Sequence, residues 1–232
     1  YCWIGSTPFS GPYNMPNDAT FNDIVTCLSF AEDGLTLGVG SLDCSIQIWN
    51  IGNPVARNLI DRKMNLLHIL VGHDGAITGV CLSVKLDIAV SSSVDHFILI
   101  HTLTNGQLLR SIAHPSAMKW NNVWLMGINK GEILGYSKED KKLRLYSSNG
   151  DELMKSSTDN IKSLAISENG ETLITGGYNG MLSFRTLASS LNIVRKIRFD
   201  TASAISVIFF SQHHVIIGFE NGDLGFLNEK NC

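Results

Sequence analysis

The sequence lacks the features that mark several large classes of protein. It has no excess of basic residues, because 18 Lys and Arg stand against 21 Asp and Glu, giving a net charge of −3 at pH 7. Binding to nucleic acid or to an anionic membrane through bulk charge is therefore not expected. No stretch reaches the ~18 apolar residues that a membrane-spanning helix needs. No segment shows a sustained helical period, so the sequence predicts an all-β protein.

Cysteine motifs and phosphate-binding loops are missing as well. The five cysteines form no C-x-x-C pair, and Cys27 and Cys81 lie in apolar runs, where a free cysteine behaves as a small buried hydrophobe. We therefore expect a reducing compartment and a cytoplasmic protein. No glycine-rich phosphate loop opens a helix, and we expect neither a metal nor a cofactor. With 232 residues, 44% of them hydrophobic, the chain can bury a core.

A short pattern recurs five times along the chain. Each copy has an Asp or Asn, two turn-forming or polar residues, and then apolar residues at alternate positions. A period of ~42 residues is typical of one four-stranded blade of a β-propeller. The copies begin 52, 45, 39 and 42 residues apart, at Asp43, Asp95, Asp140, Asn179 and Asn221.

The residues before three of these copies predict two further strands joined by a tight turn. Residues 24–43, 161–179 and 204–221 each contain an apolar run, a polar turn, a second apolar run and then small residues. Strands that are apolar on both faces need cover on both, which radial packing of sheets supplies. The turns are Asp33-Gly34, Asn169-Gly170 and Gln212-His213, of which the first two are strong hairpin signals.

We predict a β-propeller region with about five blades. The last unit has no room for a fourth strand, and the chain begins with Tyr rather than Met. We therefore expect a fragment of a larger ring of seven blades. A five-bladed ring closed by the N-terminal strand is the alternative. The predicted blades are 24–67, 68–112, 113–156, 157–198 and 199–232, after an irregular segment or blade remnant at 1–23.

These residues resemble WD40 repeats. Gly72-His73 precedes a strand, "SLD" leads to "IW" at 41–49, and "SSSVD" leads to "IH" at 91–101. The first unit keeps both the turn aspartate, Asp43, and the terminal tryptophan, Trp49, of such repeats. The other units depart from this pattern, because the tryptophan position holds His101, Tyr146, Arg185 and Leu227.

A more specific resemblance, over residues 24–229, is to the C-terminal WD40 region of BEACH-domain proteins, the group of neurobeachin, beige-like anchor and lysosomal trafficking proteins. It is carried by a "KLD" turn, by "IHTLTNGQLLR" where Trp-Asp is usual, and by the order and spacing of the third and fourth units. The segment 51–67 falls where such proteins carry a longer connection. The resemblance implies a scaffold in vesicle and lysosome-related membrane traffic, peripheral on endomembranes through domains outside this chain.

Several residues could belong to a site, and each also has a structural interpretation. In WD40 repeats the Gly-His histidine bonds through a serine and an aspartate toward the terminal aromatic residue. The resemblance therefore predicts a structural network of His73 with Ser91 or Ser93 and Asp95, with His101 in the tryptophan position. A His-Asp pair alone lacks the nucleophile and oxyanion donors that acyl transfer needs.

The five Asp and Asn residues of the repeat are expected in tight turns, where such side chains bond their own backbone and tolerate unusual φ. Five copies at one register argue against a unique metal site. Trp120 is a different case, because an exposed tryptophan would be a candidate interaction anchor and a buried one would not.

We expect a non-catalytic scaffold that binds other proteins through its loop-rich rims. A propeller enzyme is disfavoured, because the predicted inner strands 24–30, 77–84, 161–166 and 204–210 contain no Asp, Glu or His. An adaptor in another pathway is the alternative, for example a substrate receptor of a ubiquitin ligase or a complex-assembly factor. Only the BEACH resemblance separates that alternative from trafficking.

Overall fold

The all-β prediction is confirmed. The computed structural model describes residues 23–52, 64–126, 131–167, 170–187, 191–199, 203–211 and 214–228, which form 19 strands in five antiparallel sheets. No helix occurs among these residues, and so none that is long and apolar enough to cross a membrane.

Within each sheet, strands that are consecutive in sequence pair with one another. The first sheet contains β1 (Val25–Phe30), β2 (Thr36–Ser41), β3 (Ile46–Asn50) and β4 (Asn65–Leu70). The second contains β5 (Ile77–Ser83), β6 (Ile88–Ser93), β7 (Phe97–Thr102) and β8 (Leu108–Ala113). The third contains β9 (Asn122–Met126), β10 (Glu132–Ser137), β11 (Lys142–Tyr146) and β12 (Glu152–Ser157). The fourth contains β13 (Ile161–Ile166), β14 (Thr172–Gly177), β15 (Met181–Thr186) and β16 (Ile193–Arg198), and the fifth β17 (Ile205–Ser211), β18 (His214–Phe219) and β19 (Leu224–Asn228).

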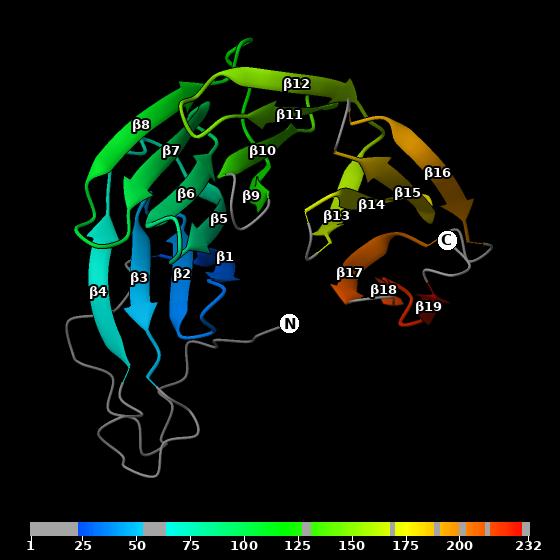
Figure 1. Cartoon of the computed structure of the whole chain (residues 1–232), viewed down its shortest axis with the longest axis horizontal. Helices are drawn as coiled ribbons and strands as arrows, with labels where there is room; N and C mark the ends of the chain where they lie inside the picture. The colour runs from blue at the N-terminus through cyan, green and yellow to red at the C-terminus, as the bar shows by residue number, and fades with distance from the viewer. Residues whose placement is uncertain are drawn as a thin grey trace.

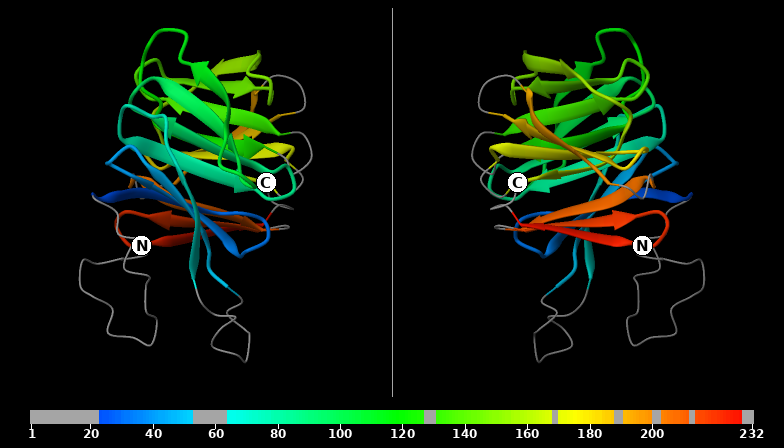
Figure 2. Two further views of the ribbon diagram at one scale, coloured as in Figure 1. Left: turned by 90° about the vertical axis from the view of Figure 1, so that its left-hand side faces the viewer. Right: turned by 90° about the vertical axis from the view of Figure 1, so that its right-hand side faces the viewer.

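The five sheets follow one another around a common axis. Figure 1, which looks along that axis, shows an arc in which the first strand of each sheet faces the centre and β4, β8, β12 and β16 lie on the circumference. The side views in Figure 2 show that the sheets are strongly twisted. The described strands form an open arc, so the prediction of a larger, seven-bladed ring stays a prediction. We refer to the sheets as blades 1 to 5.

Neighbouring blades pack through apolar faces, and glycine allows close approach. A Cβ added to Gly40 in β2 would lie 2.5 Å from Cγ2 of Ile77, the first residue of β5. The same contact recurs between blades 4 and 5, where a Cβ on Gly176 would lie 2.6 Å from Ile205. The small residues that end the second strand of these units are therefore required by the packing of the next blade.

One connection differs from its predicted extent. Residues 65–67, which the sequence places in the insertion 51–67, instead begin β4 and pair with β3. Leu66 pairs with Trp49 and packs against the small core of blade 1, so the connection ends before Asn65. The blade boundaries given above stay predictions. The segment 1–22 and the turn residues Asn169, Gln212 and His213 lie outside the described residues.

Candidate functional site

A buried hydrogen-bond network lies in blade 2, and it contains the candidates His73, Ser91 and Asp95. His73 precedes β5 and is 6% exposed. Its Nδ1 atom lies 2.7 Å from Oδ2 of Asp95, in the turn between β6 and β7, and its Nε2 atom lies 3.0 Å from Oγ of Ser91 in β6. The fold thus brings together three residues spread over 22 positions of the sequence.

The hydrogen bonds around Asp95 determine how protons are arranged in this network. Burial alone would raise the pKa of Asp95, but hydrogen bonds from the Phe97 N–H, the His73 ring and the Asp74 N–H outweigh it and lower that pKa. Asp95 is therefore a carboxylate that accepts a hydrogen bond from Nδ1–H of His73. The other ring nitrogen, Nε2, forms the hydrogen bond with the Ser91 hydroxyl.

The two candidate serines have separate partners. Ser93 does not contact His73; its hydroxyl donates to the Gly75 carbonyl at 2.8 Å and accepts the Asp95 N–H at 3.1 Å. Ser91 is the serine that bonds the histidine. Ser93 instead ties the turn aspartate to the loop that carries His73.

The order Ser91–His73–Asp95 has the connectivity of a Ser-His-Asp catalytic triad. Ser91 is only 2% exposed, in the middle of a four-stranded sheet, so a substrate cannot reach its hydroxyl. A buried network whose members satisfy one another stiffens its surroundings, because any unpaired member would carry a large desolvation cost. The geometry therefore suits a structural role.

The network ends at Ser91 and does not continue to the tryptophan position of the blade. His101 occupies that position, but its Nε2 atom lies 3.2 Å from the Val71 carbonyl, and its Nδ1 atom has no hydrogen-bond partner among the described residues. Burial lowers the pKa of His101. In blade 1 the tryptophan is present, and Nε1 of Trp49 donates to Oε1 of Gln47 at 3.1 Å.

The repeated turns share one backbone geometry. In four of them, the Asx side chain accepts a hydrogen bond from the N–H two residues later, and the residue in between has positive φ. Side-chain bonding to the local backbone is what such turns favour. The four donor N–H groups are those of Ser45, Phe97, Met181 and Asp223. The residues with positive φ are Cys44 (68°), His96 (76°), Gly180 (68°) and Gly222 (91°), so the unusual φ falls one residue after the Asx and not on it.

Asp140 does not follow this pattern, so the prediction of a self-bonded tight turn is wrong there. Its turn is one residue longer than the one in blade 2, with 138–141 in place of 94–96 between the strands. In the part of the chain that the structure describes, Oδ1 of Asp140 has no hydrogen-bond partner, and Oδ2 accepts from Nη2 of Arg144. The extra residue moves the carboxylate away from its own backbone and toward the arginine.

Two residues of a buried polar network in blade 3, His114 and Arg144, were missed by sequence reasoning. His114 precedes β9 as His73 precedes β5, and its Nε2 atom lies 3.2 Å from Nη1 of Arg144 and 3.8 Å from Oδ2 of Asp140. Burial, followed by the nearby guanidinium, lowers the pKa of His114. The only signal in the sequence was the position of His114 directly after the last strand of the preceding unit. The residue before it is Ala113, so the Gly-His pair that pointed to His73 is missing here.

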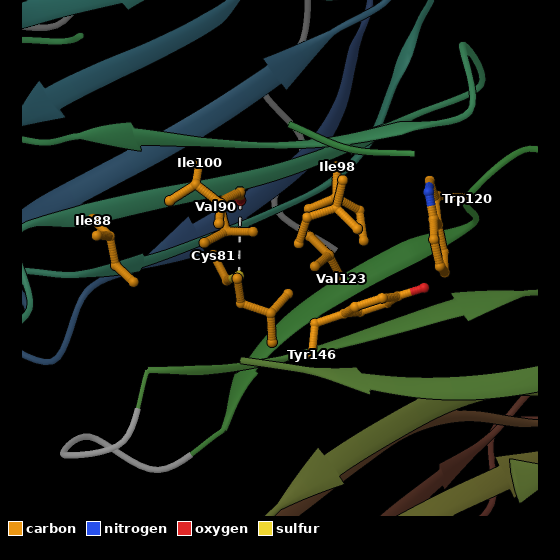
Figure 3. Packing of buried hydrophobic residues seen from close by; sticks show 10 residues of the cluster. Cys81, Ile88, Val90, Ile98, Ile100, Trp120, Val123 and Tyr146 are labelled. Atoms are coloured by element: carbon orange, nitrogen blue, oxygen red, sulfur yellow. Dashed lines mark hydrogen bonds between the residues drawn. The ribbon is translucent and has the colours of Figure 1, made fainter. Parts of the chain in front are cut away.

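Trp120 is not an interaction anchor. It is 0% exposed, and its ring meets those of His114 and Tyr146 edge to face, with centroids 4.6 and 6.1 Å apart. Nε1 of Trp120 donates to the His96 carbonyl at 3.1 Å. Figure 3 shows the ring beside Tyr146 and Ile98 in the core between blades 2 and 3. This position falls between two blades, where a large side chain fills the gap.

The cleft beside the inner strands has no charged lining side chain that could act as an acid or a base. It has a volume of about 330 Å³ and lies between β1, β5 and β9, with Ile166 of β13 at its edge. Burial raises the pKa of the Cys27 and Cys81 thiols that line it, which makes them poor nucleophiles. Within the described ranges no group of three or more His, Cys, Asp or Glu residues could hold a metal ion.

Comparisons with known proteins decide the family. A family model described as the neurobeachin beta propeller domain matches residues 15–228. The chain belongs to this family. The resemblance to the propeller region of BEACH-domain proteins, predicted from the sequence, is confirmed for this neurobeachin-type propeller region.

Named relatives agree with the family. BEACH domain-containing protein B of Arabidopsis thaliana is 34% identical over 188 residues, which are 75% of the chain and 7% of that protein. BEACH domain-containing protein lvsE of Dictyostelium discoideum is 26% identical over 220 residues, 88% of the chain and 10% of that protein. A putative neurobeachin homolog of Caenorhabditis briggsae is 26% identical over 206 residues, 84% of the chain and 8% of that protein. The propeller region thus spans a tenth or less of the length of these relatives.

A solved structure shows the same fold. The crystal structure of the computationally designed Ika8 protein matches with a TM-score of 0.67 at 22% identity, over 88% of the chain and 58% of that protein. At this identity the match speaks for the fold alone.

Proposed function

We propose that this propeller region is a non-catalytic scaffold that binds other proteins, within a BEACH-type protein of vesicle and lysosome-related membrane traffic. The scaffold is cytoplasmic and reaches endomembranes only through other domains of the protein. It needs no cofactor.

One observation supports this proposal most strongly. The Ser91–His73–Asp95 array is sealed inside blade 2, whereas side chains of differing chemistry stand on the exposed turns of the same framework. The residue before the turn Asx is Leu42 in blade 1, Val94 in blade 2 and Tyr178 in blade 4, each between 39% and 48% exposed. A rigid repeat with variable exposed turns suits recognition of partners.

Site-specific crosslinking tests the scaffold function. A photoreactive amino acid replaces Val94 on an exposed turn of the full chain, or Leu109 on the circumferential strand β8 as a control of similar exposure (39% and 54%). Crosslinks to proteins at position 94 are expected to exceed those at position 109. Partners that belong to vesicle or lysosome transport support the trafficking role, whereas partners that belong to ubiquitin ligases support the adaptor alternative.

A separate measurement tests the absence of catalysis. If the full chain hydrolyses an ester or peptide substrate, and Ser91→Ala removes that activity without lowering the melting temperature, the scaffold proposal is wrong. We expect Ser91→Ala to lower stability only, because it leaves His73 without a hydrogen-bond partner on Nε2.

A further inference from the structure

One patch on the exposed turns departs from the rest of the repeat. It contains Lys138 of the β10–β11 turn, Lys162 of β13, Tyr178 of the β14–β15 turn and Glu220 of the β18–β19 turn, and we name it the Tyr178 patch. It therefore joins blades 3, 4 and 5. Tyr178 is 48% exposed, and the side chain of Lys162 is 23% exposed.

The geometry of the patch gathers charge around an aromatic ring. Nζ of Lys138 lies 4.9 Å from the centroid of the Tyr178 ring, and Nζ of Lys162 lies 5.5 Å from it. Lys162 also pairs with Glu220 of the next blade. Two ammonium groups stand against one carboxylate, so the four side chains carry a net positive charge.

The other blades show that the fold does not need these residues. The first strands of blades 1, 2, 4 and 5 each have a β-bulge, at Thr26, Thr78, Lys162 and Ser206 respectively. In three of them the bulge residue is a hydroxyl that bonds within its own blade: Thr26 to the Gly40 carbonyl at 3.1 Å, Thr78 to the Ser92 hydroxyl at 2.9 Å and Ser206 to the Gly218 carbonyl at 3.1 Å. Lys162 cannot repeat these bonds and extends outward instead.

The turn position varies in the same way. Blades 1 and 2 place Leu42 and Val94 where blade 4 has Tyr178, and both turns keep their Asx hydrogen bond. Leucine or valine before the Asx, together with threonine at the bulge, therefore builds the same turn. Since β-bulges commonly re-aim side chains beside functional sites, the combination of a tyrosine with two lysines needs an explanation outside the blade.

We propose that the Tyr178 patch binds an acidic segment of a partner protein. A carboxylate of that segment lies between the ammonium groups of Lys138 and Lys162, and a neighbouring apolar side chain packs on the Tyr178 ring. Tyrosine is enriched in interface hot spots. The net positive charge of the patch favours an acidic partner over a basic one. The inference rests on the proposed scaffold function and assigns it a surface and a kind of partner.

Variants that copy the residues of the other blades test the patch without disturbing the fold. Tyr178→Leu combined with Lys162→Thr copies blade 1, and Lys138→Glu reverses the charge of the other lysine. Val94→Ser, at the matching turn position of blade 2, is the control. The probe is a fluorescein-labelled peptide of ten residues, Asp and Glu around one central Leu, and a second peptide carries Lys and Arg in place of the acids. Fluorescence polarisation with the full chain gives the affinities, and melting temperatures show that each variant is folded.

The expected result is tighter binding of the acidic than of the basic peptide, weakened by salt. The double variant and Lys138→Glu are expected to lose about tenfold in affinity for the acidic peptide, and Val94→Ser less than twofold. Equal binding of the two peptides, or an equal loss in Val94→Ser, would overturn the proposal. So would binding of phosphatidylserine vesicles that Lys138→Glu abolishes while the acidic peptide does not compete, because the patch would then recognise a lipid surface.

The failure of this site and the failure of the scaffold function give different results. If the crosslinking experiment captures the same proteins from wild type and from Lys138→Glu, the scaffold function stands and the Tyr178 patch is not its surface. If no protein is captured by wild type, the scaffold function itself is wrong.

Discussion

Blades 2 and 3 contain the same two elements, a histidine before the first strand and an aspartate between the second and third strands. In blade 2 the histidine bonds the aspartate directly, with 2.7 Å between His73 Nδ1 and Asp95 Oδ2. In blade 3 the corresponding separation, from His114 Nε2 to Asp140 Oδ2, is 3.8 Å, and Arg144 bonds both residues. The same positions therefore hold a direct His-Asp hydrogen bond in one blade and a His-Asp pair bridged by an arginine in the next.

The difference shows that two blades can carry the same residue types at matching positions and still pair them through different hydrogen bonds. The turn before β11 is one residue longer, and the Asp140 carboxylate does not bond its own backbone. It pairs instead with Arg144, four residues later, where blade 2 has Leu99. Each network gives a largely buried carboxylate a hydrogen-bond donor, the His73 ring for Asp95 and the Arg144 guanidinium for Asp140, which offsets part of the cost of burying the charge. The following predictions test how separate the two solutions are.

The largest effect is expected from Arg144→Leu, which gives blade 3 the residue of blade 2. The side chain of Arg144 is 4% exposed, and its loss leaves the carboxylate of Asp140 buried without a cation. We expect a decrease in the free energy of unfolding of about 3 to 5 kcal/mol, measured by urea denaturation. Adding Asp140→Asn should recover part of this loss. No recovery would show that the arginine acts through Glu152, His114 or packing instead of through Asp140.

His73→Ala should have the next largest effect. It removes the partner of both Asp95 and Ser91 in a buried network, so we expect a loss of about 2 to 3 kcal/mol in the free energy of unfolding. Ser91→Ala alone should cost about 1 kcal/mol, because it removes one hydrogen bond. A cost for Ser91→Ala as large as that for His73→Ala would mean that the serine carries the network.

Acidity should affect blade 3 through His114. Because burial and Arg144 lower the pKa of His114, the unfolded chain takes up a proton at higher pH than the folded chain does. The unfolded-state pKa is about 6.5, so this histidine costs nothing above that value, and stability is lost as the pH falls from there toward the folded-state pKa.

The melting temperature of wild type should therefore fall more steeply between pH 7 and pH 5 than that of His114→Gln. Parallel curves of melting temperature against pH for the two proteins would contradict a lowered pKa of His114. His101, whose pKa is also lowered by burial, stays in both proteins and contributes equally to the two slopes.

The smallest effects are expected in the turns. His96 and Lys141 hold positive φ values of 76° and 53°, which glycine adopts without strain. Replacing either by glycine should raise the free energy of unfolding by about 0.5 kcal/mol, and Gly180→Ala, as the reverse change, should lower it by about 1 kcal/mol. Thermal melts of the three variants measure this. A loss on His96→Gly would show that the imidazole has a contact worth more than the strain.

Much of the architecture was predictable because it depends on patterns among residues that are close in sequence. Apolar alternation, Asp-Gly at 33–34 and the spacing of the Asx residues predicted strands, a hairpin and blades, all of which depend on neighbours in sequence. The network of His73 could be anticipated from the family pattern, although the choice of Ser91 over Ser93 could not. That choice depends on which face of β6 meets the loop before β5.

Other features depend on contacts between distant segments. The burial of Trp120 follows from the approach of blades 2 and 3, and its position in a loop gave no periodicity to read. The bonding of His114 to Arg144 joins residues 30 positions apart across two strands. Likewise, Lys138, Lys162, Tyr178 and Glu220 form one patch only because three blades pack side by side.

The sequence by itself determined the fold class, the repeat and the family, because these follow from periodicity and from residues in fixed local register. Only the tertiary structure decided which polar residues satisfy one another, which tryptophan is buried and where charge gathers on the exposed turns. The physical reason is that burial and pairing are properties of surfaces brought together by packing. Two copies of one repeat can therefore pair the corresponding aspartates, Asp95 and Asp140, with a histidine in one blade and an arginine in the next.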